Sequence, residues 1–179
     1  MTDNSVLSEL KYSAERGALE FKGVRYLLIR PETLRSLHEA AEGELGTPKA
    51  ADLLFAGGFT GGKLSGERYK QTLGLSIAEA VEFMCRMGGE IGWGRFRLVD
   101  LDEAVSRLIV EVEHSPFAED YDEPTQAGVC HLTRGVLSGL AAGLFEVDVS
   151  TNEVQCLAKG DPLCRFEIAV AQERTASAS

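Results

Sequence analysis

The hydrophobic and polar positions change their period several times along the chain, which divides it into strands and helices. In residues 17–30, aliphatic and aromatic side chains stand on both sides of Lys22 and Gly23, a pattern that predicts two strands joined by a turn. Residues 31–45 open with a proline and are followed by Gly46, which are start and stop signals of a helix. The N-terminal part therefore predicts a strand pair and then a helix.

A second helical segment begins near Pro48 and runs into the glycine-rich stretch FAGGFTGGKLSGERY, residues 55–69. Each glycine in a helix interior weakens the helix by about 1 kcal/mol relative to alanine. We therefore expect this segment either to bend or to pack very closely against another element. The next helix is predicted over residues 76–92, where Ser76 and Glu79 have the spacing of a capping box.

Strand patterns and one further helix complete the chain. In the segment EAVSRLIVEVEHS, residues 103–115, alternate positions such as Leu108, Val110 and Val112 form one apolar face. The remaining predicted elements are a strand at 93–102, a helix at 125–145, and two strands at 152–158 and 162–170. This order, without an internal repeat or a linker, predicts a single α+β domain with an antiparallel sheet and helices packed on one face.

We expect three regions along the chain. The polar residues 1–16 form a lead-in or a short helix, residues 17–171 form the domain, and the polar residues 172–179 form a disordered tail. The length of 179 residues suits one domain with a sizeable core.

Composition narrows the classes of function. The net charge of −10 argues against nucleic acids and anionic membrane surfaces as partners. No apolar run is long enough to cross a bilayer, and residues 1–17 lack the basic start and apolar block of a secretory signal. We therefore expect a cytoplasmic protein, whose four cysteines are free, catalytic or metal-bound rather than paired in disulfides.

Gly135, Gly139 and Gly143 recur every four residues in the last predicted helix and leave a stripe without side chains. Such a stripe allows close packing against the sheet or against another helix. The same stripe could instead form the face of a homodimer.

Cys156 and Cys164 flank the stretch LAKGDPL, in which residues 160–162 are strong turn formers. A symmetric hairpin centred on Gly160 places the two cysteines opposite each other, with Cβ atoms about 4.5–5.5 Å apart. Two thiolates at that separation can share a tetrahedral zinc ion. From the spacing alone, a metal site, unligated thiols, and a redox pair or disulfide all stay open.

Residues 128–168, GVCHLTRGVLSGLAAGLFEVDVSTNEVQCLAKGDPLCRFEI, resemble the C-terminal half of the 4-vinyl reductase domain family. The shared pattern is a cysteine ahead of a glycine-rich helix, then a glutamate, a cysteine, a Gly-Asp turn and Cys-Arg-Phe. The segments at 17–34, 88–102 and 112–119 resemble earlier parts of the family, so the likeness covers roughly residues 17–170. The family includes ligand-sensing domains of bacterial aromatic-compound regulators and stand-alone hydrocarbon-binding proteins.

The resemblance implies a structural zinc site. Phenol-sensing members of the family hold zinc with three cysteines and a glutamate, which match Cys130, Glu153, Cys156 and Cys164. A closed set of four ligands leaves no position for a catalytic water. An ideal strand would point Glu153 and Cys156 to opposite faces, so a bulge or turn between them is required. If the carboxylate is not a ligand, His131 or water is the substitute.

The resemblance also implies a pocket for a small hydrophobic or aromatic molecule, walled by helices and sheet. Mostly apolar lining with few polar groups is typical of such pockets. Each lining residue taken singly is also typical of an ordinary core, as is the lone Cys85. The residues that we expect to line the pocket are Phe55, Phe59, Tyr69, Phe83, Met84, Trp93, Phe96, Phe117 and Tyr121.

The sequence shows no catalytic constellation. His38, His114 and His131 are scattered, and the stretch GGFTGGKLSG lacks the frame of a phosphate-binding loop. No dinucleotide or flavin signature indicates a self-sufficient reductase. We therefore expect a binding module rather than an enzyme.

The leading hypothesis is a zinc-stabilised sensor or carrier of a small hydrophobic molecule, which passes its signal through a homodimer or a protein partner. The family name also implies an alternative, namely a reductase or an accessory protein in tetrapyrrole metabolism of the bacteriochlorophyll type. A third interpretation is a structural adaptor, related to vesicle-tethering proteins that share this broad fold.

Overall fold

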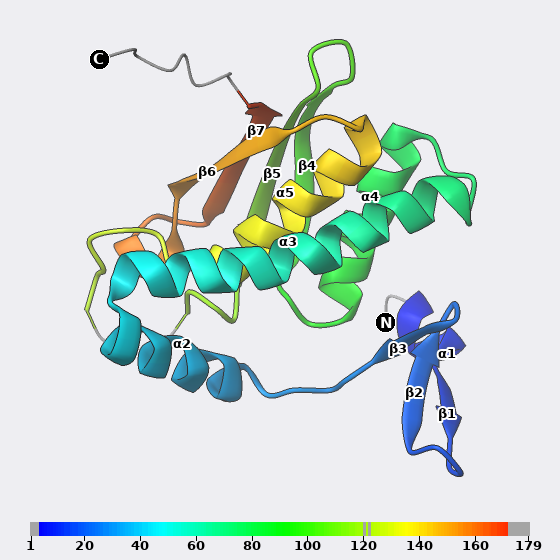
Figure 1. Ribbon diagram of the computed structural model, residues 1–179, viewed down its shortest axis with the longest axis horizontal. Coiled ribbons are helices and arrows are strands. Elements are labelled where there is room, and N and C mark those ends of the chain that lie inside the picture. The colour runs from blue at the N-terminus through cyan, green and yellow to red at the C-terminus, as the bar shows by residue number, and fades with distance from the viewer. Residues whose placement is uncertain (1–3, 120, 122, 172–179) are drawn as a thin grey trace.

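The elements of the chain follow the predicted order, with short additions at the N-terminus and before the last strand (Figure 1). The computed structural model describes residues 4–119, 121 and 123–171, so the tail expected at 172–179 lies outside the described residues. The helices are α1 (Ser5–Glu9), α2 (Pro31–Leu45), α3 (Thr47–Gln71), α4 (Ile77–Glu90), α5 (His131–Phe145) and the short 3-10 helix η1 (Leu157–Lys159). The strands are β1 (Lys11–Ser13), β2 (Ala18–Phe21), β3 (Val24–Tyr26), β4 (Arg95–Asp102), β5 (Arg107–Glu113), β6 (Val149–Gln155) and β7 (Cys164–Val170).

The strands form two antiparallel sheets. β1, β2 and β3 make a small sheet near the N-terminus, and the larger sheet has the order β4-β5-β7-β6. α4 and α5 pack on one face of the larger sheet, α3 packs on α5, and α2 packs on α3 (Figure 1). The predicted α+β class is confirmed, although β2 and β3 pair with β1 instead of joining the larger sheet.

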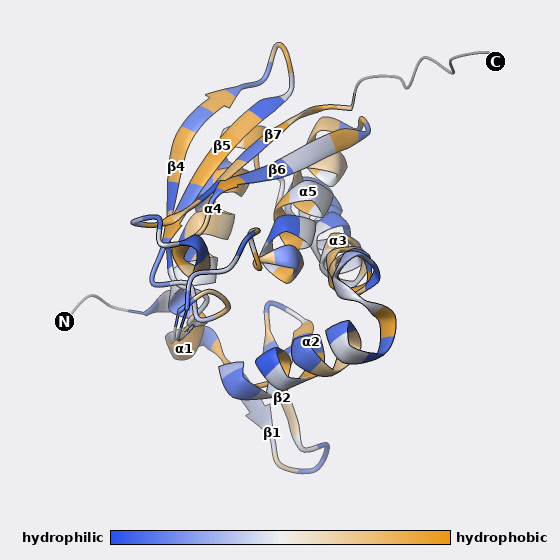
Figure 2. Cartoon of the chain, turned by 90° about the vertical axis from the view of Figure 1, so that its left-hand side faces the viewer, coloured by the Kyte–Doolittle hydropathy of each residue, from blue (hydrophilic) through white to orange (hydrophobic). Residues whose placement is uncertain are grey.

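The inner face of the larger sheet carries the core. Hydrophobic and hydrophilic positions alternate along β4 and β5 (Figure 2). Leu108, Val110 and Val112 of β5 are fully buried, as the predicted alternation requires. Phe166 and Ile168 of β7 pair with this strand and are buried beside it. An antiparallel sheet with one packed face and one wet face produces this pattern.

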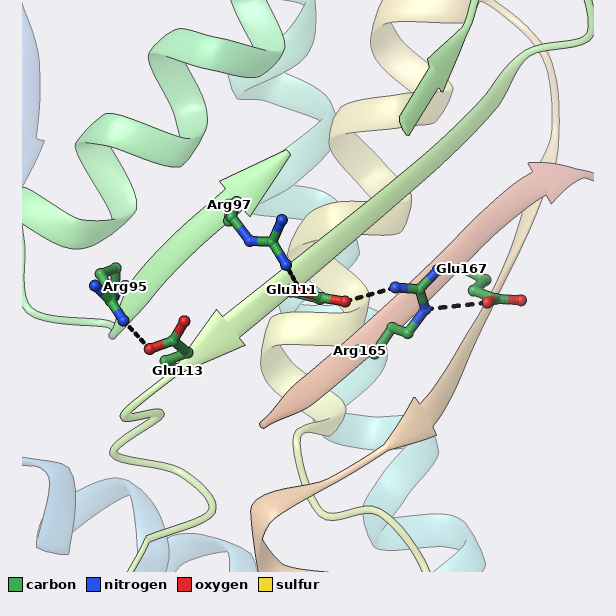
Figure 3. A network of polar contacts seen from close by, with 6 residues as sticks. All are labelled: Arg95, Arg97, Glu111, Glu113, Arg165 and Glu167. Carbon is green, nitrogen blue, oxygen red and sulfur yellow. Dashed lines mark hydrogen bonds and ion pairs between the residues drawn. The ribbon is translucent and has the colours of Figure 1, made fainter. Parts of the chain in front are cut away.

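The outer face of the same sheet carries charged side chains (Figure 3). Glu111 of β5 lies between two arginines, because it pairs with Arg97 of β4 and, at 2.5 Å, with Arg165 of β7. Exposed ion pairs contribute little to stability, so the main effect of this network is to keep the face polar. Further pairs on this face join Arg95 to Glu113 and Arg165 to Glu167.

Helices α3 and α5 are in backbone contact along their glycines. A Cβ atom built on Gly62 of α3 would lie 2.0 Å from a carbonyl oxygen of α5, and one built on Gly139 of α5 would lie 2.0 Å from a carbonyl oxygen of α3. Gly58 and Gly135 meet the opposite helix almost as closely, at 2.2 Å. The predicted close packing is confirmed. The alternative of a homodimer through this stripe is wrong, because α3 covers it.

The helix expected from residue 125 begins only at His131. Backbone groups before it are bound to other elements: the N–H of Thr125 donates to the carbonyl of Ala158, and the N–H of Cys130 donates to the carboxylate of Glu153. These bonds hold the segment against the β6–β7 hairpin. Cys130 is consequently the N-cap residue of α5.

Smaller differences from the sequence-based expectation concern the ends of elements. The lead-in region contains α1 and β1, and the predicted strand at 103–115 is shortened because residues 103–106 form a turn. The last two strands are offset by two or three residues from their predicted bounds. Over the described ranges, no helix is both long enough and apolar enough to span a bilayer.

Replacing Gly62 by alanine is expected to destabilise the protein by about 1–3 kcal/mol, because the added methyl group forces α3 and α5 apart. Gly57 offers a matched control on the same helix, since a Cβ atom there meets nothing within 4 Å. Gly57→Ala is expected to stabilise the protein by about 0.5–1 kcal/mol through helix propensity. Urea denaturation measures both changes, and a Gly62→Ala variant as stable as Gly57→Ala would contradict the backbone contact.

Candidate metal centre and adjoining cavity

Four side chains that lie far apart in sequence converge at the start of α5. Cys130 comes from the N-cap of α5, Glu153 from β6, Cys156 from the residue after β6, and Cys164 from the start of β7. One donor atom from each lies within 4.8 Å of the others. The three cysteines are at most 1% exposed. The structure therefore brings together all four residues that the sequence proposed as ligands.

A β-bulge solves the problem of the odd spacing between Glu153 and Cys156. β6 pairs regularly with β7 up to Glu153, and its register then shifts before Gln155. The residue between them, Val154, is 42% exposed and is the extra one in the strand. A bulge of this kind re-aims the following side chains, so both the carboxylate and the Cys156 thiol reach the cluster.

Backbone amides of the turn fix the hairpin around the thiols. The N–H of Cys156 donates to Oδ2 of Asp161 at 2.8 Å, and the N–H of Leu157 donates to Sγ of Cys164 at 3.4 Å. Gly160 follows in the left-handed region, with φ of +90°, and closes the turn. The cluster is thus set by a short, hydrogen-bonded turn rather than by flexible side chains.

Glu153 is held in place from the opposite side by the segment before α5. The N–H of Cys130 donates to its Oε2 at 3.1 Å, and its Oε1 is buried without a hydrogen-bond partner. A Cβ atom on Gly128 would lie 2.3 Å from Oε2. A glycine at that position is therefore what leaves room for the carboxylate.

The electrostatics of the cluster disfavour several negative charges at once. Burial raises the pKa of Glu153 to about 8. The hydrogen bond to Cys156 raises the pKa of Cys130, whereas the pKa of Cys156 is lowered by the hydrogen bonds that it accepts from Cys130 and Cys164. The protein alone thus supports one thiolate shared among three sulfurs. Further deprotonation requires a cation in the cluster.

The donor set fits a tetrahedral zinc ion. Zinc–sulfur bonds of about 2.3 Å place two sulfurs of a tetrahedron about 3.8 Å apart. The sulfurs of Cys130 and Cys164 are 3.6 Å apart, far beyond the length of about 2.05 Å of a disulfide bond. All four cysteines are free, and burial raises the pKa of the remote Cys85 to about 12.

A small cavity adjoins the cluster. Val129 and Leu132, on either side of Cys130 and His131 in the sequence, line this cavity, whose volume is about 30 Å³. Two of the predicted pocket residues, Phe117 and Tyr121, line it as well. The other lining residues are Pro31, Leu34, Arg35, His38 and Leu54.

Trp93 lies one ring away from this cavity, because its indole packs edge-on against Phe117 with ring centroids 5.0 Å apart. Phe55 and Phe59, also predicted for the pocket, lie on α3 with their rings 6.0 Å apart. The guanidinium of Arg134 stands over the ring of Phe55. These two phenylalanines do not line the cavity.

The remaining predicted pocket residues pack elsewhere. Phe83 meets Tyr69 edge-on at 4.9 Å, Met84 is buried in the core, and the ring of Phe96 occupies the space beside Gly88. The nine residues therefore do not surround one common space in this conformation. Phe117, Tyr121 and Trp93 are the group that the fold brings together.

His38 is a cavity residue that the sequence argument missed. It is 7% exposed and is the one buried residue of α2. Its ring packs edge-on against His131 at 5.3 Å, and burial lowers the pKa of His131 to about 4. Its spacing from Leu34 on α2, four residues, is the helical signal that could have placed both on one face.

Comparison with known proteins identifies the C-terminal part of the chain. Residues 108–170 match the family model of the vinyl-4-reductase domain, and this segment contains the whole cysteine–glutamate cluster. The resemblance to the 4-vinyl reductase domain family is thereby confirmed. An uncharacterized protein of Methanocaldococcus jannaschii is 31% identical over 65 residues, which are 35% of this chain and 34% of that protein. The chain thus matches about a third of that relative's length.

Solved structures share the fold over most of the chain. The phenol-responsive sensory domain of the transcription activator PoxR, solved with phenol, has a TM-score of 0.82 at 22% identity and covers 92% of this chain and 86% of that one. A vinyl-4-reductase family protein from Methanocaldococcus jannaschii has a TM-score of 0.55 at 15% identity, over 82% and 85% of the two chains. A trafficking protein particle complex subunit 3 from Naegleria fowleri, covalently bound to palmitic acid, has a TM-score of 0.56 at 12% identity, over 79% and 95%.

Removing the carboxylate that holds the hairpin is expected to loosen the cluster. Asp161→Ala leaves the buried N–H of Cys156 without its charged acceptor and should cost about 1.5–3 kcal/mol of unfolding free energy. Lys159 is the control, because its ammonium is 3.5 Å from the same carboxylate at the surface, and Lys159→Ala should cost less than about 1 kcal/mol. Scanning calorimetry compares the two variants. Equal losses would show that the amide bond is not what holds the turn.

Proposed function

We propose that this protein is a zinc-stabilised binding module for a small hydrophobic or aromatic molecule, and that it acts as a sensor or carrier. The observation that carries the proposal is the convergence of four metal-ligand donors within 4.8 Å directly beside an apolar cavity. Cluster and cavity share the segment 129–132, so whatever fixes one fixes a wall of the other.

The metal has a structural role in this proposal. Cys130, Glu153, Cys156 and Cys164 would fill all four positions of a zinc ion, which leaves none for a reacting water. Zinc supplies the positive charge that lets the buried thiolates and the carboxylate coexist. The bound ion would join the start of α5 to the β6–β7 hairpin. Thiolates of this kind survive in a reducing compartment, which agrees with a cytoplasmic location.

The structural neighbours support a small apolar ligand. PoxR's sensory domain responds to phenol, and the trafficking subunit carries palmitic acid, so two proteins of similar fold hold small apolar molecules. In this chain, Phe117, Tyr121 and the neighbouring Trp93 provide aromatic walls. Nothing in the described residues favours the tetrapyrrole alternative.

The N-terminal region supports a homodimer, or a protein partner that receives the signal. Leu27, Leu28 and Ile29 follow β3 and are 79%, 82% and 51% exposed. With Trp93 and residues of α1, they line an apolar groove of about 290 Å³. Large apolar side chains exposed side by side are typical of interaction surfaces. A second copy of the chain is the occupant that we propose for this groove.

Purified protein is expected to contain one zinc ion per chain. Loss of a ligand through Cys156→Ser should weaken zinc binding by at least about 100-fold, since even changes behind the ligands cost 10–100-fold. Cys85→Ser is the matched control, because Cys85 is a buried cysteine outside the cluster. Elemental analysis after gel filtration, followed by chelator competition, reads both variants. A metal-free wild type that keeps its fold would falsify the metal part of the proposal.

Leu28→Asp is expected to turn a dimer into a monomer, because it places a charge in the apolar groove. Leu64→Asp on α3 is the control, since Leu64 is 63% exposed but does not line the groove. Light scattering coupled to gel filtration gives the mass of each. A monomeric wild type, or a dimer that survives Leu28→Asp, overturns the proposed dimer and leaves the metal site unaffected.

A further inference from the structure

Helix α2 is held to the rest of the chain by few buried contacts. A surface helix usually buries an apolar stripe, yet the one buried residue of α2 is His38. Leu37 on the same helix is 57% exposed. α2 packs on α3, and an extended, exposed segment at 27–30 joins it to β3 (Figure 1). Elements with few buried contacts open more readily than the rest of a fold.

His38 also presents a polar atom that nothing satisfies. Its ring lines the cavity together with Leu34, Leu54 and Tyr121. Its Nε2 is buried and has no hydrogen-bond partner among the described residues, and the nearest charged group, Oε1 of Glu42, is 3.6 Å away. A buried polar group of this kind is rare in native proteins and points to a ligand or a water.

The cavity is too small for a ring-sized guest in this conformation. Its volume is about 30 Å³, which holds about one water, whereas a cavity that binds benzene has about 150 Å³. α3 and α5 are locked together by their glycines, and the loop before α5 is tied to the hairpin. α2 is therefore the wall that can move outward.

We propose that α2 is a lid whose buried His38 is the polar anchor of the cavity, and that the cavity takes a small, neutral, largely apolar molecule with one hydroxyl group. This inference rests on the proposed binding of a small molecule and adds the place, the anchor and the ligand class. Movement of α2 would then report occupancy to the exposed segment 27–29.

A neutral hydroxyl is the head group that these surroundings favour. The carboxylate of Glu42 lies 3.6 Å from Nε2 of His38 and repels an anion. A hydroxyl both donates and accepts, so it pairs with either tautomer of the imidazole. Arg35 lines the cavity too, but it donates to the carbonyl of Glu119 and stands over the ring of Tyr121.

The chain contains its own reporter for this cavity. Trp93 is the one tryptophan in the sequence, and it packs on Phe117, which lines the cavity. Titrations of the intact protein with benzyl alcohol, toluene and benzoate, followed by tryptophan fluorescence and calorimetry, compare a hydroxyl, no polar group and an anion on one ring. Benzyl alcohol is expected to bind at least about tenfold more tightly than toluene or benzoate, about 1.4 kcal/mol.

His38→Phe keeps a ring but removes the hydrogen bond. It is expected to weaken benzyl alcohol binding about tenfold and to leave toluene binding within about twofold. His114→Asn is the control: His114 is an exposed histidine outside the cavity with φ of +54°, a conformation that asparagine tolerates. It should change neither affinity. Leu54→Trp fills the cavity and should abolish both.

Hydrogen exchange tests the lid. The amides of α2 should exchange faster than those of α5 in the free protein and should slow when benzyl alcohol binds. If all probes bind but His38→Phe weakens none selectively, if benzoate binds best, or if α2 shows no change, the inference is wrong and the proposed function stands. If no probe binds the wild type, the cavity holds water only, and both fail.

Discussion

Three buried thiols and one buried carboxylate within 4.8 Å of one another are the constraint on which the C-terminal half of this domain depends. Without a cation the four groups cannot all be ionised, and burial holds the pKa of Glu153 at about 8. A metal ion converts this conflict into a bond between the start of α5 and the β6–β7 hairpin. The segment before α5, the bulge in β6 and the turn after Cys156 all serve to bring the donors to one point.

The same arrangement divides the domain into fixed and movable parts. The glycine contacts between α3 and α5 and the cluster at the start of α5 fix two walls of the cavity. α2 closes the third side with a single buried histidine. A binding module needs such a division, because a rigid frame positions the site while one weakly held element admits the ligand. The charged outer face of the sheet takes no part in this division.

Much of this could be read from the sequence where the determining contacts are local. Ser76 and Glu79 form the predicted capping box, and the odd spacing of Glu153 and Cys156 required the bulge that is found. The glycine spacing predicted a close contact but not that α3 would be the partner. His131 as the start of α5, and the burial of His38, depend on contacts with distant elements, which a local pattern does not contain. The aromatic residues were recognised by type, and only the fold separates Phe117 and Tyr121 from those packed elsewhere.

X-ray absorption at the zinc edge of the protein as purified tests the central claim most directly. The account predicts zinc with three sulfurs at about 2.3 Å and one oxygen at about 2.0–2.2 Å, with the oxygen lost or replaced in Glu153→Ala. Zinc surrounded only by nitrogen and oxygen, or protein that folds with no metal edge at all, would contradict it.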